Sequence, residues 1–194
     1  TLSAIGWTSW DVTSLAQEWV AGSLPNEGVL VRGENGQHPY VRYEAIAGEH
    51  SDSTRWPRLN VSYYVPTPTA TPTPLYTYTP TRTPLPTVHT FQQGSDGYAG
   101  VRDVYLDNSY PGQPQGAGDA LWLRGDATKK RLLAFDLSAI PSYATVQKAT
   151  LSLWSLYGYP AGTPRQCGVR QVLRPWDEGQ ATWEVAATGV PWGA

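Results

Sequence analysis

The sequence RLNVSYYVPTPTATPTPLYTYTPTRTPLPT at residues 58–87 decides the fold, because a strand pattern in it runs directly into a segment that can form neither strand nor helix. At its start, Leu59, Val61 and Tyr63 fall on alternate positions, as in a strand with one buried face. From Pro66 onward proline and threonine dominate, and each proline removes a backbone donor and fixes φ. We therefore predict one strand followed by an extended linker.

This linker covers residues 66–87 and separates two globular segments, residues 1–65 and 88–194. At about 3.1 Å per residue in polyproline II, it can span on the order of 65 to 70 Å. Threonines in proline-rich exported segments are frequent acceptors of O-linked sugars, and a bare flexible linker is the alternative. The candidate O-glycosylation sites are Thr67, Thr69, Thr71, Thr73, Thr77, Thr79, Thr81, Thr83 and Thr87.

The two segments show short strand patterns separated by Gly/Pro turns, which predicts an all-β, jelly-roll-like β-sandwich split into two halves by the linker. One short helix near the N-terminus is predicted within residues 11–22, where Leu15 and Trp19 share a face and Gly22 suits the C′ position. Besides residues 58–64, strands are expected at residues 28–32, 131–137, 149–154 and 168–173. In residues 131–137, Leu133, Phe135 and Leu137 alternate, which predicts a strand with one buried face.

Composition excludes several classes of partner. The net charge is −2 and the basic residues are scattered, so no nucleic-acid partner is expected. No apolar run approaches the roughly 20 residues that a membrane span needs. Because the chain begins with Thr1 and contains a single cysteine, Cys167, we predict a mature or excised piece of a longer protein without a disulfide of its own.

Catalytic residues are not apparent in the sequence. His38, His50 and His89 lie in polar or turn-like settings without metal-ligand spacing. Asp177 and Glu178 are adjacent, so in a strand they would point to opposite faces and could not flank one glycosidic bond. We predict that the protein is not an enzyme.

No cofactor is certain, but a structural calcium ion is plausible in a jelly-roll-like module. Its candidate ligands are Asp103, Asp107 and Asn108, and turn formation explains these residues equally well.

Sugar binding is the other candidate activity, because exposed aromatic rings can stack on pyranose faces. The candidate stacking residues are Tyr157, Tyr159, Tyr40 and Tyr43, with packing in the core or at its rim as the alternative.

The motif LRPWDEGQATW at residues 173–183 resembles the disaggregatase-related repeat domain, DNRLRE. Residues 90–94, 131–142 and 10–20 fit the same family. The resemblance implies an extracellular jelly-roll-like module, related to a carbohydrate-binding-module family with alginate-binding members, in which the motif has a structural role.

The order of the segments differs from that of the family. Residues 88–194 resemble the front of the domain, and residues 1–65 resemble its back. The chain is then a window cut from a tandem array, or a permuted subunit completed by the next chain, or a single domain whose linker loops back. We favour the first two arrangements, because a stiff spacer longer than the domain is a poor connection within one fold.

An isolated half-sandwich exposes sheet edges and an apolar face, so each half needs a partner. We therefore predict head-to-tail association between copies of the chain or between repeats. The predicted function is a structural subunit of a secreted extracellular filament or cell-surface stalk, in which sandwiches are joined by O-glycosylated rods. The alternative is a carbohydrate-binding or adhesive module of a secreted multidomain protein with a polysaccharide partner.

Overall fold

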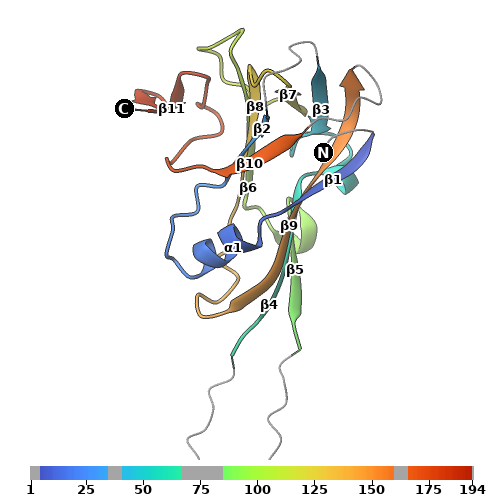
Figure 1. Ribbon diagram of the computed structural model, residues 1–194, viewed down its shortest axis with the longest axis vertical. Helices are drawn as coiled ribbons and strands as arrows, with labels where there is room; N and C mark the ends of the chain where they lie inside the picture. Colours follow the sequence, from blue (N-terminus) through green and yellow to red (C-terminus); the bar gives the residue numbers. More distant parts are fainter. Residues whose placement is uncertain (1–4, 35–40, 67–84, 160–165, 194) are drawn as a thin grey trace, which may run out of the picture.

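Two packed antiparallel sheets form the body of the protein, as the computed structural model shows for residues 5–34, 41–66, 85–159 and 166–193 (Figure 1). The larger sheet has the order β5-β4-β9-β3-β7, with β1 also paired to β9, and the smaller sheet has the order β10-β2-β8-β6. A short pair, β11-β12, stands apart. The predicted all-β sandwich is confirmed.

The elements and their bounds are β1 (Gly6–Asp11), α1 (Thr13–Val20), β2 (Val29–Gly33), β3 (Arg42–Ile46), β4 (Arg58–Tyr64), β5 (Thr87–Gln92), β6 (Val101–Asp107), β7 (Ala120–Arg124), β8 (Lys129–Phe135), β9 (Thr145–Tyr159), β10 (Cys167–Gln171), β11 (Val185–Ala187) and β12 (Val190–Pro191).

The long strand β9 organises the larger sheet. β4 pairs with residues 145–152 of β9, β1 with residues 150–155, and β3 with residues 155–159. Residues 150–152 pair with both β1 and β4, and Ser155 pairs with both β1 and β3. β1 therefore takes one side of β9, while β3 and β4 follow each other along the opposite side.

The two segments complete each other within one chain, which corrects the expectation that a second repeat or chain would do so. β4, the last strand before the linker, pairs with β5, the first strand after it, from Arg58↔Gln92 to Tyr63↔Thr87. In the smaller sheet β2 lies between β8 and β10. The length of the linker does not prevent this closure. The entropy lost when the two ends of a loop are brought together grows only with the logarithm of the loop length, so a long linker adds little to the free-energy cost.

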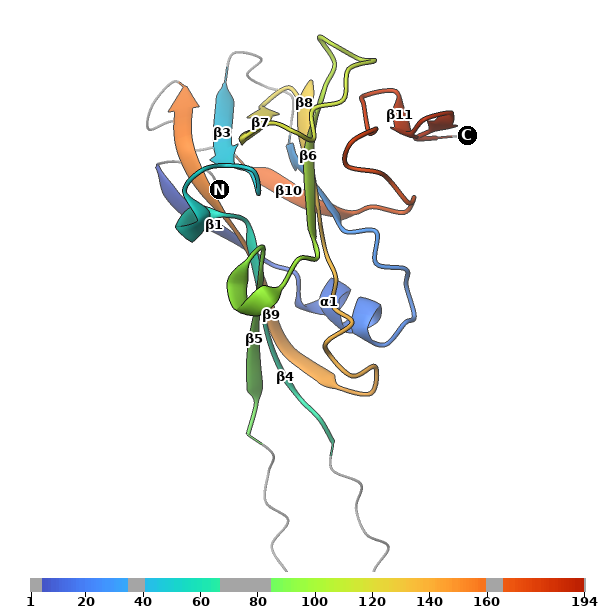
Figure 2. The ribbon, with the colours of Figure 1, turned by 180° about the vertical axis from the view of Figure 1, so that it is seen from behind.

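The two ends of the linker accordingly leave the sandwich side by side, from β4 and β5 (Figure 2). Of the predicted glycosylation sites, Thr87 is the first residue of β5 and is exposed. The others lie outside the described residues, and they are Thr67, Thr69, Thr71, Thr73, Thr77, Thr79, Thr81 and Thr83.

The main core lies between the two sheets, and β4 contributes Leu59, Val61 and Tyr63 to it, as predicted. β8 differs from the expectation of one buried face. Leu133 points into the main core, whereas Leu132 belongs to a second cluster on the opposite face of the strand. That second cluster is completed by the segment after β10, through Trp176, Ala181 and Ala186.

The helix α1 is tied to the start of β9 by hydrogen bonds from backbone N–H groups of the strand to side chains of the helix. The Val146 N–H donates to Gln17 Oε1 (2.8 Å), and the Ala149 N–H donates to Thr13 Oγ1 (3.0 Å). Gly22, with φ of +70°, follows the helix in the left-handed conformation that its sequence position predicts. No helix in the described part of the chain has the length and apolar character to cross a membrane.

Candidate functional site

Four side chains form an aromatic face on the outside of the larger sheet, where β3 lies between β7 and β9. The face consists of Arg42, Trp122, Tyr157 and Tyr159. The register of β3 positions them. Arg42 lies opposite Tyr159 of β9, and Glu44 lies between Tyr157 of β9 and Trp122 of β7. The intervening residues of these strands point the other way, into the core.

Arg42 lies at the centre of this face. Its guanidinium carbon is 5.7 Å from the ring centroid of Trp122, 5.6 Å from that of Tyr157 and 5.9 Å from that of Tyr159. At these distances cation–π attraction holds the guanidinium among the rings. Tyr157 is 39% exposed and Tyr159 is 52% exposed, so both side chains are accessible to a ligand.

A register irregularity in β9 aims Tyr157 outward. Glu44 pairs with Tyr157 and Ala45 with Ser155, so one residue of β9 is skipped between them. Such a bulge shifts the alternation of side chains by one position. As a result Trp154 and Tyr157 share the outer face although they are three residues apart.

A second aromatic cluster extends this face along β9 and β1. The rings of Trp7 and Trp154 meet edge to face with their centroids 5.4 Å apart. Arg58 covers the Trp7 ring at 3.9 Å, and Arg55 covers the Trp154 ring at 4.6 Å. The outer face of the larger sheet thus carries a strip in which aromatic rings alternate with arginines.

A groove of about 590 Å³ borders the aromatic face. It is lined by Arg42, Tyr105, Asp107, Tyr110, Trp122, Arg124, Lys129 and Tyr159. Two of the basic residues that line the groove form ion pairs with carboxylates: Lys129 pairs with Asp107, and Arg124 Nη2 lies 3.7 Å from Asp126 Oδ2. Arg42 makes no ion pair with any described residue, although its charge acts on Glu44 two residues along β3, where burial raises the pKa of the carboxyl group and Arg42 partly offsets that rise.

Asp107 is ionised in this groove. Burial favours its neutral form, but the hydrogen bonds from Lys129 and Ser109 outweigh burial and hold the pKa of its carboxyl group below the usual value. The carboxylate in turn fixes Lys129 beside the Tyr105 ring, with 5.5 Å between the ammonium nitrogen and the ring centroid.

The predicted stacking residues do not all lie on the aromatic face. Tyr157 and Tyr159 are on the aromatic face. Tyr43 is not a surface residue: it is 2% exposed and belongs to the core, where its ring packs over Gly158 so closely that a Cβ there would lie 2.9 Å from it. Tyr40 lies outside the described residues.

The predicted calcium ligands do not converge. Asp107 is held by Lys129, and Asn108 is an exposed residue whose N–H donates to the Thr128 carbonyl. Asp103 is buried and lies instead with Glu49 and Glu178, from two other parts of the chain.

Sequence reasoning missed Arg42 and Trp122 because β3 and β7 were not predicted as strands. A signal for β7 was present, since Leu121 and Leu123 alternate with Trp122 and Arg124 in the sequence ALWLR. The bulge that turns Tyr157 outward leaves no such pattern.

Residues 96–188 match the model of carbohydrate-binding module family 96. The match includes three members of the aromatic face, Trp122, Tyr157 and Tyr159, and it confirms only the coarser part of the predicted resemblance, the relation to carbohydrate-binding modules. No curated protein and no solved structure matches the chain.

Proposed function

We propose that the protein is an extracellular, non-catalytic carbohydrate-binding module that binds a polysaccharide along the aromatic face. The observation that carries this proposal is the exposed Arg42 guanidinium, held among three aromatic rings beside a groove and in no ion pair with a described residue. The match of residues 96–188 to a carbohydrate-binding module family supports it.

Each part of the face has a distinct task in binding. The apolar C–H faces of pyranose rings pack on Trp122, Tyr157 and Tyr159, which supply large rigid surfaces at a small cost in side-chain entropy. The guanidinium of Arg42 has five N–H donors and can hydrogen-bond sugar hydroxyls or grip a sugar carboxylate with two parallel bonds. Because the rings already fix Arg42, little freedom is lost when it binds.

The sequence had placed a structural filament subunit first and a carbohydrate-binding module second. The aromatic face and the family match favour the second. The filament hypothesis depended on two incomplete halves, and in this structure the halves pair with each other through β4 and β5, β2 and β8, and β3 and β9.

Affinity gel electrophoresis and titration calorimetry against neutral and acidic polysaccharides test the proposal. We expect saturable binding to at least one of them, and Arg42→Ala, Trp122→Ala and Tyr157→Ala should each lower the affinity by about tenfold or more, which corresponds to about 1.4 kcal/mol.

Tyr143→Ala is the matched control, because Tyr143 is 66% exposed but lies just before the opposite end of β9. It should bind like the wild type. Absence of binding to every polysaccharide, or equal affinities of the three variants and the wild type, would contradict the proposal. Binding that weakens steeply with added salt identifies an acidic polysaccharide, since screening acts on the charge of Arg42.

A further inference from the structure

Three carboxylates from distant parts of the sequence converge at one end of β6. Glu49 comes from the loop between β3 and β4, Asp103 from β6, and Glu178 from the segment after β10. One oxygen of each lies within 4.8 Å of those of the other two. Oxygens bound to a single calcium ion at about 2.4 Å can be at most about 4.8 Å apart, so the three groups are within reach of one ion.

Asp103 is the most deeply buried of the three carboxylates. It is 2% exposed, and its Oδ2 accepts a hydrogen bond from the Gly48 N–H (2.8 Å). Its Oδ1 is also buried and has no hydrogen-bond partner among the residues that the structure describes. A buried carboxylate oxygen without a donor is strongly destabilising unless a proton or a cation satisfies it.

Among the described residues, no cation forms an ion pair with Glu49, Asp103 or Glu178. The charge of the neighbouring Arg102 reaches Glu178 and partly offsets the rise in pKa that burial causes there. Its guanidinium is nevertheless held by Trp176, since Nη1 donates to the Trp176 carbonyl (2.6 Å) and the guanidinium covers the Trp176 ring at 4.9 Å.

The three carboxylates are held in place by the surrounding backbone. The Asp103 N–H donates to Glu178 Oε1 (2.6 Å), which ties the segment after β10 to β6. Gly116 lies so close to Glu178 that a Cβ would be 2.0 Å from the Glu178 carbonyl oxygen, so the chain between β6 and β7 packs directly against this side of the site.

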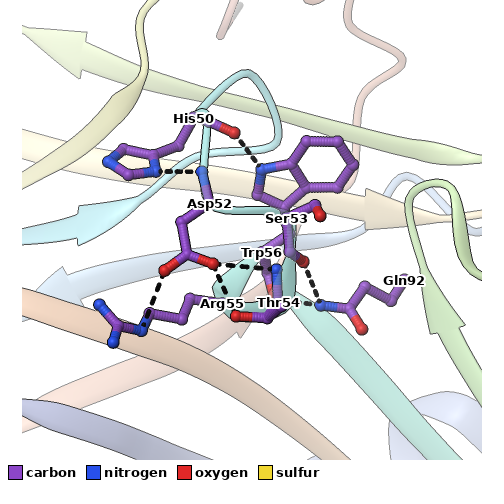
Figure 3. Close-up of polar contacts among 7 residues, drawn as sticks. All are labelled: His50, Asp52, Ser53, Thr54, Arg55, Trp56 and Gln92. Carbon is purple, nitrogen blue, oxygen red and sulfur yellow. Dashed lines mark hydrogen bonds and ion pairs between the residues drawn. The ribbon is translucent and has the colours of Figure 1, made fainter.

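The loop that carries Glu49 is also braced, as Figure 3 shows for the residues that follow it. Trp56 Nε1 donates to the His50 carbonyl (2.6 Å). From β5, Gln92 Nε2 donates to the carbonyls of Ser53 (3.2 Å) and Trp56 (3.1 Å). A loop fixed in this way presents Glu49 to the cluster before any ion binds.

We propose that Glu49, Asp103 and Glu178 form a binding site for a divalent cation and that this cation is calcium. The donors are all carboxylate oxygens, which suits a hard cation, and calcium accepts an irregular set of six to eight oxygens completed by water. The ion would join the loop before the linker to β6 and to the segment after β10, and so fasten the two segments of the chain together.

The electrostatics of the cluster agree with this assignment. Burial, together with the charges of Glu49 and Glu178, raises the pKa of Asp103 well above its usual value, and burial also raises the pKa of Glu178. A divalent cation would offset the cost of burying the Asp103 charge and the repulsion that Glu49 and Glu178 exert on it.

Titration of the chelator-treated full chain with calcium chloride, by calorimetry, tests the proposal together with thermal unfolding in calcium and in EDTA. We expect one calcium ion per chain and a higher melting temperature in calcium. Glu49→Gln should lower the calcium affinity by about tenfold or more, because it removes one of the three charged ligands. Glu49 is exposed, so we expect this variant to fold like the wild type.

Asp103→Asn should abolish the calcium response, and without calcium it should unfold no earlier than the wild type, since a buried charge has been removed. Asp177→Asn, a change at the exposed neighbour of Glu178, is the control and should bind calcium like the wild type. A wild type without calcium binding, or Glu49→Gln with unchanged affinity, would overturn the site. Tighter binding of magnesium than of calcium would overturn the choice of ion.

Discussion

At the scale of single residues, Arg131 is the most unusual side chain of the core. It is fully buried, and only its Nη2 donates a hydrogen bond, to the Tyr43 carbonyl (2.9 Å). Its Nε and Nη1 have no hydrogen-bond partner among the described residues. Burial lowers the pKa of Arg131 to about 10, which reflects the penalty of keeping a guanidinium charged between the two sheets.

We predict that Arg131→Met leaves the free energy of unfolding unchanged or raises it by up to about 2 kcal/mol, because an apolar side chain of similar volume removes the buried charge and keeps the space filled. Arg131→Ala is the companion variant and should be less stable than the wild type by about 2 to 4 kcal/mol, because it leaves a cavity. Denaturation in guanidinium chloride measures both. A large destabilisation in Arg131→Met would mean that the guanidinium has partners that stabilise the fold.

The candidate site was partly predictable residue by residue. Tyr157 and Tyr159 stand out in the sequence because tyrosines in a Gly/Pro-rich stretch are seldom all core residues. Arg42 could not be singled out, because its role comes from three rings on two neighbouring strands. Glu49 and Glu178 were missed as companions of Asp103 for the same reason: side-chain periodicity says which face a residue takes but not which distant segment it meets.

At the scale of elements, local alternation predicted β4 with its observed bounds, whereas β8 shows the limit of that signal. β8 reads KKRLLAF, and Leu132, Leu133 and Phe135 are all buried. The alternation of Leu133, Phe135 and Leu137 indicated one buried face. The second face is buried by a segment that follows β10, and the pattern of β8 itself cannot show that segment. That cover depends on Trp176, whose Nε1 donates to the Glu27 carbonyl (2.8 Å) just before β2.

We predict that Leu132→Ala and Leu133→Ala each lower the free energy of unfolding by about 2 to 4 kcal/mol, because both side chains are buried although they point to opposite faces of β8. Leu173→Ala is the matched control, since Leu173 is 76% exposed, and its change should stay within about 0.5 kcal/mol. If Leu132→Ala behaved like the control, the segment after β10 would not cover β8 in solution.

At the scale of the whole molecule, the two segments pair with each other across the linker. The sequence correctly indicated that residues 1–65 and 88–194 are complementary. It could not show where the complement lies, because strand patterns carry no information about pairing partners. The register of β4 with β5 places the linker ends next to each other, and strands of both segments share each of the two sheets of the body.

This arrangement leaves the first segment without a sheet of its own. Within the described residues, β1, β2, β3 and β4 pair only with strands that follow the linker. Residues 1–65 expressed alone should therefore be unfolded, since every described strand in them needs a partner strand from residues 87–171.

The connection between the segments should in turn be dispensable once the chain has folded. A specific protease site placed between Pro66 and Leu85 lies outside every strand pair of the described residues, so cleavage should leave two fragments that sediment together with the 21.2 kDa mass of the intact chain. The fragments should separate only in denaturant, because hydrogen bonds and core contacts of both sheets join them. Uncut protein is the control and should sediment at the same mass. Fragments that part under native conditions would refute closure within one chain, and a ladder of larger species in the uncut sample would show instead that segments are exchanged head to tail between chains.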